Sequence, residues 1–166
     1  IDCPEQMPYS NIPHFPVPTV EGHAGMLWIG KLEGVPILGF QGRKHYYEAA
    51  DEPFNTGILQ VAFPVHVLAN LQVPNYFATN AAGGLHPRYN IGDIMVIRSH
   101  MSQIPNSLLG AHYTFTTPGG ISVPRFVPLS KAYDPEFRKL LKEAGSDASR
   151  KSGRLPSRVH EGVYMA

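Results

Sequence analysis

Three short segments combine residue types that can bind an anion, and the first is the run QGRKHYYE at residues 41–48. It directly follows the apolar run Val35–Phe40, which has the character of a strand. Ligands in α/β sheets bind beyond the carboxyl ends of strands. Arg43 can bind an oxyanion through two parallel hydrogen bonds, and the neighbouring Lys44 and His45 are further donors. The segment therefore predicts an anion site at the end of a strand.

The end of the same segment carries side chains suited to a sugar and to a histidine. Tyr46 and Tyr47 offer flat rings and hydroxyls, and Glu48 can orient a histidine. The alternative for the whole segment is an ordinary polar turn with an exposed basic pair. These residues taken alone leave both interpretations open.

The second segment is TNAAGGL at Thr79–Leu85, after the strand-like run Asn75–Thr79. Small side chains let backbone N–H groups approach a ligand, and Gly83 and Gly84 allow conformations that are closed to other residues. The alternative is a tight turn that needs small side chains for packing. In the third segment, EGHAG, the side chain of His23 either donates to an anion or caps a turn.

The elements that must position these segments alternate between strands and helices. Strand-like apolar runs cover Met26–Ile29, Val35–Phe40, Asn75–Thr79, Asp93–Arg98 and Val159–Met165. Several are nearly continuous in apolar residues, which is typical of strands covered on both faces. Spacings of three and four predict a helix over Ile58–Leu71, with Pro64 as a local conflict. This alternation predicts an α/β domain.

A second helix is predicted from Asp134 onward. Asp134 suits the N-cap, Pro135 the first helical position, and Gly145 the end of the helix. The remaining stretches are expected to be irregular: a proline-rich arm at 1–20, a long connection at 99–127 and a polar, basic linker at 146–158.

Composition narrows the class of protein. The chain has 166 residues, 43% of them hydrophobic, and a net charge of +1, which predicts one globular domain over 1–166 with no nucleic-acid partner. No apolar run approaches the roughly 20 residues that span a bilayer, and residues 1–16 lack the pattern of a signal peptide, so we expect a cytoplasmic protein without a membrane partner. Cys3 is the single cysteine, and no metal-type spacing of histidines occurs. We therefore expect no metal and no covalent catalysis.

In order and spacing, the runs VEGHAG, FQGRKHYYE, FPVHVL, TNAAGGL, IGDIMVI and EGVYMA resemble the trimeric purine nucleoside phosphorylases. The resemblance runs from about Tyr9 onward. It implies a mixed, barrel-like twisted sheet surrounded by helices, incomplete at both ends, in a homotrimer. It also implies phosphorolysis of purine nucleosides to free base and ribose 1-phosphate, with inorganic phosphate as co-substrate and no cofactor.

The resemblance also implies roles for individual residues. The implied phosphate-binding residues are His23, Arg43, Lys44, His45 and Ala81, and the implied catalytic residues are His45 and Glu48. The implied nucleoside-binding residues are Tyr47, Asn80, Ala82 and Gly83, and Phe126 is the implied contact with a neighbouring subunit's pocket.

The chain also departs from the family pattern. Extra residues lie between Glu48 and Phe63, where relatives are shorter, and the chain stops at Tyr164–Ala166, within the strand that should lead to the purine-binding segment. We therefore expect these 166 residues alone to give no measurable phosphorolysis. A methylthioadenosine-type phosphorylase and a non-catalytic phosphate- or nucleoside-binding remnant remain alternatives. The residues do not distinguish guanosine, inosine and adenosine as substrates.

Overall fold

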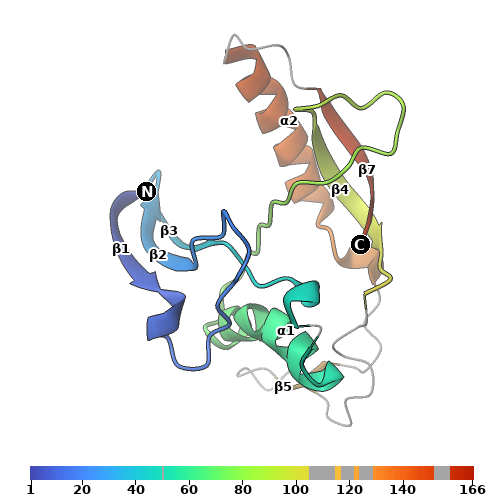
Figure 1. The fold of residues 1–166 in the computed structure, drawn as a ribbon. Helices are drawn as coiled ribbons and strands as arrows, with labels where there is room; N and C mark the ends of the chain where they lie inside the picture. Colours follow the sequence, from blue (N-terminus) through green and yellow to red (C-terminus); the bar gives the residue numbers. More distant parts are fainter. Residues whose placement is uncertain (50, 105–114, 117–121, 124–128, 152–157) are drawn as a thin grey trace. The chain divides into compact units, whose positions relative to one another are not determined.

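The computed structural model describes residues 1–166 apart from 50, 105–114, 117–121, 124–128 and 152–157 (Figure 1). The chain divides into two compact units, residues 1–75 with 105–125 and residues 76–104 with 126–166, and each is described by itself. Helices and strands alternate, which confirms the predicted α/β class. The described strands form three separate small sheets and no closed barrel. The prediction of one partial domain over 1–166 stays a prediction.

The first unit contains an antiparallel sheet of three strands. These are β1 (Asp2–Pro8), β2 (Met26–Leu32) and β3 (Val35–Gln41), in the order β1-β2-β3 (Figure 1). Glu33 and Gly34, with φ of 50° and 80°, form the two-residue turn between β2 and β3. Two positive φ values in succession match the right-handed twist of the paired strands. The second strand of the hairpin, β3, therefore ends where the predicted anion-binding segment, residues 41–48, begins.

The predicted irregular arm over 1–20 is wrong in its first part. Residues Asp2–Pro8 form β1 and pair with β2, from Asp2 opposite Lys31 to Pro8 opposite Met26, with an irregularity between Asp2 and Glu5. Proline is tolerated on the edge strand of a sheet, where its missing N–H costs no ladder bond. The proline count alone therefore overstated the irregularity of this segment.

The core of the first unit is an aromatic cluster around Tyr9, which is 1% exposed. The ring centroids of Tyr9 and Phe15 lie 4.6 Å apart, and Phe15 lies 5.7 Å from Phe40 and 5.9 Å from Phe63. The Tyr9 hydroxyl donates to the carbonyl oxygen of Gly42 at 2.9 Å. Burial raises the pKa of Tyr9 to about 12, so the hydroxyl keeps its proton and remains a donor. The core is thereby joined to the residue that follows β3.

Helix α1 (Phe54–Asn70) confirms the helix predicted over Ile58–Leu71 and begins four residues earlier. It continues through Pro64, which removes one backbone hydrogen bond from the interior. Its apolar side chains Ile58 and Leu68 are buried, whereas Val65 is 50% exposed. The helix therefore tolerates Pro64 while it buries Ile58 and Leu68 within the first unit.

The second unit pairs two parallel strands with one helix. Strands β4 (Ile94–Met101) and β7 (Val159–Met165) lie side by side, with α2 (Pro135–Lys151) next to them (Figure 1). Arg138 and Lys142 on α2 both pair with Glu161 on β7. The shorter elements are η1 (Tyr9–Asn11), η2 (Tyr46–Ala49), β5 (Phe115–Thr116), β6 (Ser122–Val123) and η3 (Leu129–Lys131).

Asp93 joins the starts of the two parallel strands. One carboxylate oxygen accepts from the Arg158 backbone N–H at 3.0 Å, and the other contacts His160 Nε2 at 2.8 Å and accepts from the Asn90 N–H at 2.9 Å. The Asn90 and His160 hydrogen bonds lower the pKa of Asp93 to about 2. These bonds fix the register of β7 against β4. They also give His160, for which the sequence predicts no functional role, a structural contact.

The predicted start of α2 is confirmed and its predicted end is wrong. The Asp134 carboxylate accepts from the backbone N–H of Phe137 at 2.9 Å, as an N-cap does, and the helix begins at Pro135. The helix continues past Gly145 to Lys151. A Cβ atom on Gly145 would lie 2.9 Å from the Cγ2 of Val159. Gly145 therefore serves close helix–strand packing, and residues 146–151 of the predicted linker are helical.

Two strand predictions also need correction. Residues 75–79 adopt no regular structure, and their side chains are exposed. A strand forms by backbone pairing with another strand, and among the described residues this segment is part of none of the three sheets. The prediction that the apolar strands are covered on both faces also fails in the described residues. Leu32 at the end of β2 is 53% exposed, and Val35 at the start of β3 is 60% exposed. Apolar content alone does not reveal whether a strand has neighbours.

Neither of the two helices that the structure describes, α1 and α2, has the length and the apolar character that a membrane crossing demands.

We predict that Tyr9→Phe lowers the free energy of unfolding by about 1–2 kcal/mol, because it leaves the Gly42 carbonyl without its donor. Urea denaturation of the chain measures this loss. Tyr76→Phe is the matched control: that side chain is 61% exposed, and we expect a change below about 0.5 kcal/mol. Equal losses in the two variants would show that the hydroxyl contributes nothing to the core.

Candidate functional site

The loop after β3 requires glycine at position 42. Gly42 has a φ of 91°, a conformation that side chains disfavour. A Cβ atom here would also lie 2.8 Å from the Cβ of His23. The glycine therefore allows residues 42–48 to approach the His23 loop.

His23 and Arg43, predicted from separate segments, are brought together. Nδ1 of His23 lies 2.8 Å from the Arg43 carbonyl oxygen and 3.1 Å from the Arg43 backbone nitrogen. One ring nitrogen either donates to the carbonyl or accepts from the N–H, so the tautomer of His23 selects the partner. In both cases Nδ1 is engaged with the backbone, and Nε2 is the ring nitrogen that faces other partners.

Glu48 holds two loops together through both carboxylate oxygens. Its Oε1 lies 2.7 Å from Nδ1 of His45 and accepts from the His45 backbone N–H at 2.6 Å. Its Oε2 accepts from the backbone N–H and the hydroxyl of Thr19, at 2.6 and 2.7 Å. The Glu48 side chain is 2% exposed. The predicted orientation of a histidine by Glu48 therefore matches the geometry.

These bonds determine the ionisation of Glu48. Burial would raise the pKa of Glu48, but the hydrogen bonds from Thr19 and His45 outweigh it and lower the pKa to about 2. The carboxylate is therefore ionised near neutral pH and accepts hydrogen bonds only. Because Oε1 cannot donate, the hydrogen between the two groups belongs to Nδ1 of His45. Nε2 of His45 is the atom left to meet a ligand.

Three rings extend from this pair in a row. The ring centroids of His23 and His45 lie 4.7 Å apart, and those of His45 and Tyr47 lie 5.0 Å apart with planes at 11°. Tyr47 is 64% exposed. The first unit thus gathers His23, Arg43, His45, Tyr47 and Glu48. A row of two imidazoles beside an arginine suits an anion, and the exposed phenol suits a sugar.

Lys44 has different surroundings from those predicted. Its ammonium donates to Glu52 Oε1 at 3.1 Å and to Gln60 Oε1 at 2.6 Å, and its side chain is only 12% exposed. Arg43, the preceding residue, is exposed. The predicted contact of Lys44 with phosphate stays a prediction that this geometry does not favour.

The segment Asn80–Gly84 belongs to the second unit. Asn80 donates through its side-chain amide to the Ala81 carbonyl at 3.1 Å, and the residues of the segment are exposed. A Cβ atom on Gly83 would meet no atom within 4 Å, and one on Gly84 would lie 3.3 Å from the Cβ of Tyr89. The backbone at Ala81, Ala82 and Gly83 is therefore accessible to a ligand, as small side chains predicted.

Thr19, Glu52 and Gln60 were missed by sequence reasoning. Thr19 follows a proline, has no motif around it and reaches Glu48 from 29 residues away. Glu52 and Gln60 are eight residues apart, and Glu52 precedes the helix that carries Gln60. No sequence signal marks any of the three. Phe126, the predicted contact with a neighbouring subunit, lies outside the described residues.

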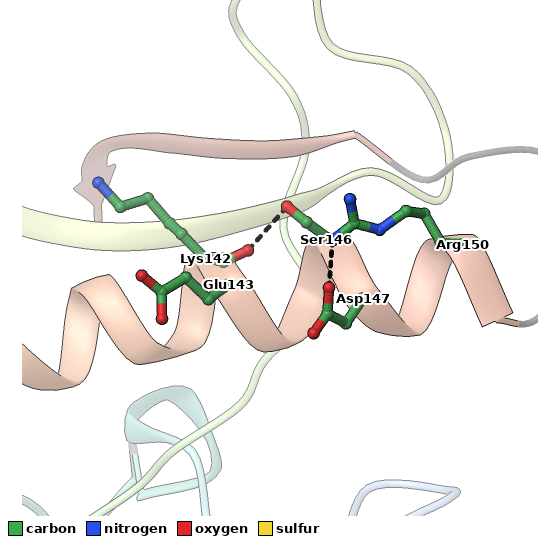
Figure 2. Close-up of a pocket in the computed structure, with 5 residues that line it drawn as sticks. All are labelled: Lys142, Glu143, Ser146, Asp147 and Arg150. Atoms are coloured by element: carbon green, nitrogen blue, oxygen red, sulfur yellow. Dashed lines mark hydrogen bonds and ion pairs between the residues drawn. The ribbon is translucent and has the colours of Figure 1, made fainter.

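Figure 2 shows a concave surface elsewhere in the chain, along α2. Ser146 donates to the Lys142 carbonyl at 2.8 Å, and Arg150 pairs with Asp147. All of these side chains come from one helix, and of them Lys142 also pairs with Glu161 on β7, so this surface is a polar helix face. In the described part of the chain, no three His, Cys, Asp or Glu residues are grouped as a metal ion would require.

The comparisons with known proteins identify the family of the chain. The family model described as "Phosphorylase superfamily" matches residues 2–166, so the chain belongs to the phosphorylase superfamily. Purine nucleoside phosphorylase 1 of Geobacillus stearothermophilus is 41% identical over 162 residues, covering 97% of this chain and 52% of that protein. The Bos taurus purine nucleoside phosphorylase is 43% identical over 136 residues, covering 79% of this chain and 43% of that protein.

The solved structures point to the same family. The Schistosoma mansoni purine nucleoside phosphorylase in complex with inosine has a TM-score of 0.75 at 32% identity, covering 99% of this chain and 54% of that chain. A Schistosoma purine nucleoside phosphorylase in complex with guanosine has a TM-score of 0.74 at 31% identity, covering 99% of this chain and 54% of that chain. The predicted resemblance is confirmed. The chain spans about half the length of the curated relatives it matches.

We predict that Glu48→Gln removes a pH-dependent part of the stability. The pKa of Glu48 is lowered from 4.5 to about 2, so its contribution is complete above about 4.5 and is lost as the pH falls toward 2. Urea denaturation of both proteins should show a gap in unfolding free energy that shrinks over this range. The exposed Glu143→Gln is the control, with little difference at any pH. A gap that does not change with pH would contradict the assignment.

Proposed function

We propose that the protein containing this chain catalyses the phosphorolysis of purine nucleosides, releasing a free purine and ribose 1-phosphate. The observation that carries the proposal is the orientation of His45 by the ionised Glu48, beside His23 and Arg43. The relatives support it, because they are purine nucleoside phosphorylases and their structures include complexes with inosine and guanosine.

In this proposal, His23, Arg43 and His45 hold the attacking phosphate. The arginine supplies two parallel donors, and each histidine meets the phosphate through Nε2, since each Nδ1 is engaged elsewhere. With Nδ1–H facing Glu48, Nε2 of His45 donates to a phosphate oxygen when the ring is an imidazolium and accepts from a phosphate hydroxyl when it is neutral. By the family resemblance, the one backbone N–H of Ala81 also contacts the phosphate, and Asn80, Ala82 and Gly83 bind the nucleoside. Tyr47 contacts the ribose.

The chemistry requires positioning more than a nucleophilic side chain. As the purine leaves, the sugar becomes cation-like, and a phosphate held against the anomeric carbon stabilises that charge and then forms the new bond. Glu48 contributes by keeping the Nε2 side of His45 toward the ligand. The proposed complete protein is a cytoplasmic homotrimer with a barrel-like mixed sheet, in which Phe126 reaches a neighbouring subunit's pocket.

The test of the phosphate site is Arg43→Ala in the complete gene product. We predict a loss in kcat/KM for phosphate of roughly 10- to 150-fold, because a charge-assisted bidentate contact contributes about 1.5–3 kcal/mol. An inosine-plus-phosphate assay that follows hypoxanthine release gives the value. Arg150→Ala is the matched control, since that arginine is exposed and pairs with Asp147. Near-normal phosphate kinetics in Arg43→Ala would remove the residue from the site.

Gly83→Val tests whether the second segment acts through its backbone. A valine Cβ meets nothing within 4 Å here, so we expect unfolding free energy to change by less than about 0.5 kcal/mol. Activity should nevertheless fall at least about tenfold, because the side chain fills the space where a ligand approaches the backbone. Thermal unfolding and the phosphorolysis assay are measured on the same preparation. A variant that unfolds outright would favour a packing role for the glycine.

A further inference from the structure

Lys44, Glu52 and Gln60 form a closed cycle of hydrogen bonds beside the candidate site. The Lys44 ammonium donates to Glu52 Oε1 at 3.1 Å and to Gln60 Oε1 at 2.6 Å. The Gln60 amide completes the cycle by donating to Glu52 Oε2 at 2.5 Å. Each of the three side chains therefore contacts the other two.

The cycle engages most of the hydrogen-bond donors of the Lys44 ammonium. The Lys44 side chain is 12% exposed, and a charge so far removed from water needs an opposite charge and hydrogen-bond acceptors. Glu52 supplies the charge, and two of the three ammonium donors are engaged. A phosphate that used Lys44 would have to displace a carboxylate already in place.

The cycle connects the candidate loop to α1. Gln60 belongs to α1, Glu52 lies in the turn before it, and Lys44 stands between the two proposed phosphate ligands in sequence. A second contact supports the same junction: a Cβ atom on Gly57 of α1 would lie 2.8 Å from the Cβ of Ala49, the last residue of η2. The backbone of Glu52 also donates to the Ala49 carbonyl at 3.1 Å.

We propose that Lys44 is a positioning residue, which fastens residues 42–49 to α1 through Glu52 and Gln60 and so sets the direction of Arg43 and His45. The proposal rests on the proposed phosphorolysis. The loop is then held from two sides, by Glu48 through Thr19 and by Lys44 through α1. The charge of Lys44 acts on Glu52, and phosphate affinity depends on it only indirectly.

The variant Glu52→Gln distinguishes this positioning role from direct phosphate binding, because the two roles predict opposite changes in its phosphate kinetics. If Lys44 bound phosphate, Glu52→Gln would free the ammonium from a competing carboxylate, and KM for phosphate would fall or stay unchanged. If Lys44 positions the loop, Glu52→Gln and Lys44→Met both lower kcat/KM for phosphate by about ten- to a hundredfold, as displaced ligands do. The double variant should then lose no more than the worse single variant, because both changes break one unit.

Two further variants serve as controls in the same assay. Lys44→Arg keeps the charge and N–H donors for Glu52 and Gln60, so it should lose less kcat/KM than Lys44→Met. Lys139→Met removes an exposed lysine of α2 and should leave the kinetics unchanged. Additive losses in the double variant, or an improved KM in Glu52→Gln, would overturn the positioning role. The positioning role would also be overturned if Lys44→Met or Glu52→Gln lost thermal stability but kept its kcat and KM at low temperature.

Hydrogen exchange tests the same junction without depending on turnover. Peptides covering 42–49 should exchange faster in Lys44→Met, in Glu52→Gln and in Gly57→Ala, whose added Cβ displaces η2 without altering charge. Exchange in Lys139→Met should match the unmodified protein. Unchanged protection in all three variants would overturn the proposal. Faster exchange in a gene product that showed no phosphorolysis would support the junction and refute the proposed function alone.

Discussion

The hydroxyl of one buried tyrosine links the hydrophobic core of the first unit to its candidate site. Tyr9 is 1% exposed and packs against Phe15 and Phe40, and Phe15 in turn packs against Phe63 of α1. Its hydroxyl donates to the carbonyl of Gly42, the residue with the positive φ that turns the chain toward His23. An apolar ring with one polar atom can satisfy both requirements, because the ring is desolvated while the hydroxyl retains its partner. The direction of the loop therefore depends on the packing of the core.

Two charged pairs then orient the side chains of the loop that follows β3. Glu48 is nearly fully buried yet ionised, because four hydrogen bonds from Thr19 and His45 compensate its desolvation. Those bonds also decide which nitrogen of His45 carries the hydrogen. Lys44 and Glu52 form the second pair, on the side of α1. Lys44 and His45 are adjacent in sequence, yet Lys44 pairs with Glu52 and His45 pairs with Glu48. Successive residues of this short loop therefore have different partners.

Much of the local structure could be predicted from the sequence because it depends on neighbours along the chain. The strands at Val35–Gln41 and Val159–Met165, and the capped start of α2 at Asp134, follow from apolar runs and from cap residues. Gly145 was misjudged because a glycine that ends a helix and a glycine that lets a helix approach a strand look alike in sequence. Only the position of Val159, 2.9 Å from the missing Cβ, distinguishes them.

The sequence by itself determined which residue types were available for an anion and a sugar, and that they follow strand-like runs. It also carried the family resemblance, since motifs such as GRKHYYE and TNAAGGL are properties of residue order. The tertiary structure alone decided which residues work together: Thr19 with Glu48 across 29 positions, and Lys44 with Gln60 across 16. The physical reason is that hydrogen bonds and ion pairs act over about 3 Å in space, whatever the separation along the chain. Desolvation, which distinguishes the largely covered side chain of Lys44 from the exposed Arg43, likewise exists only once the chain has folded.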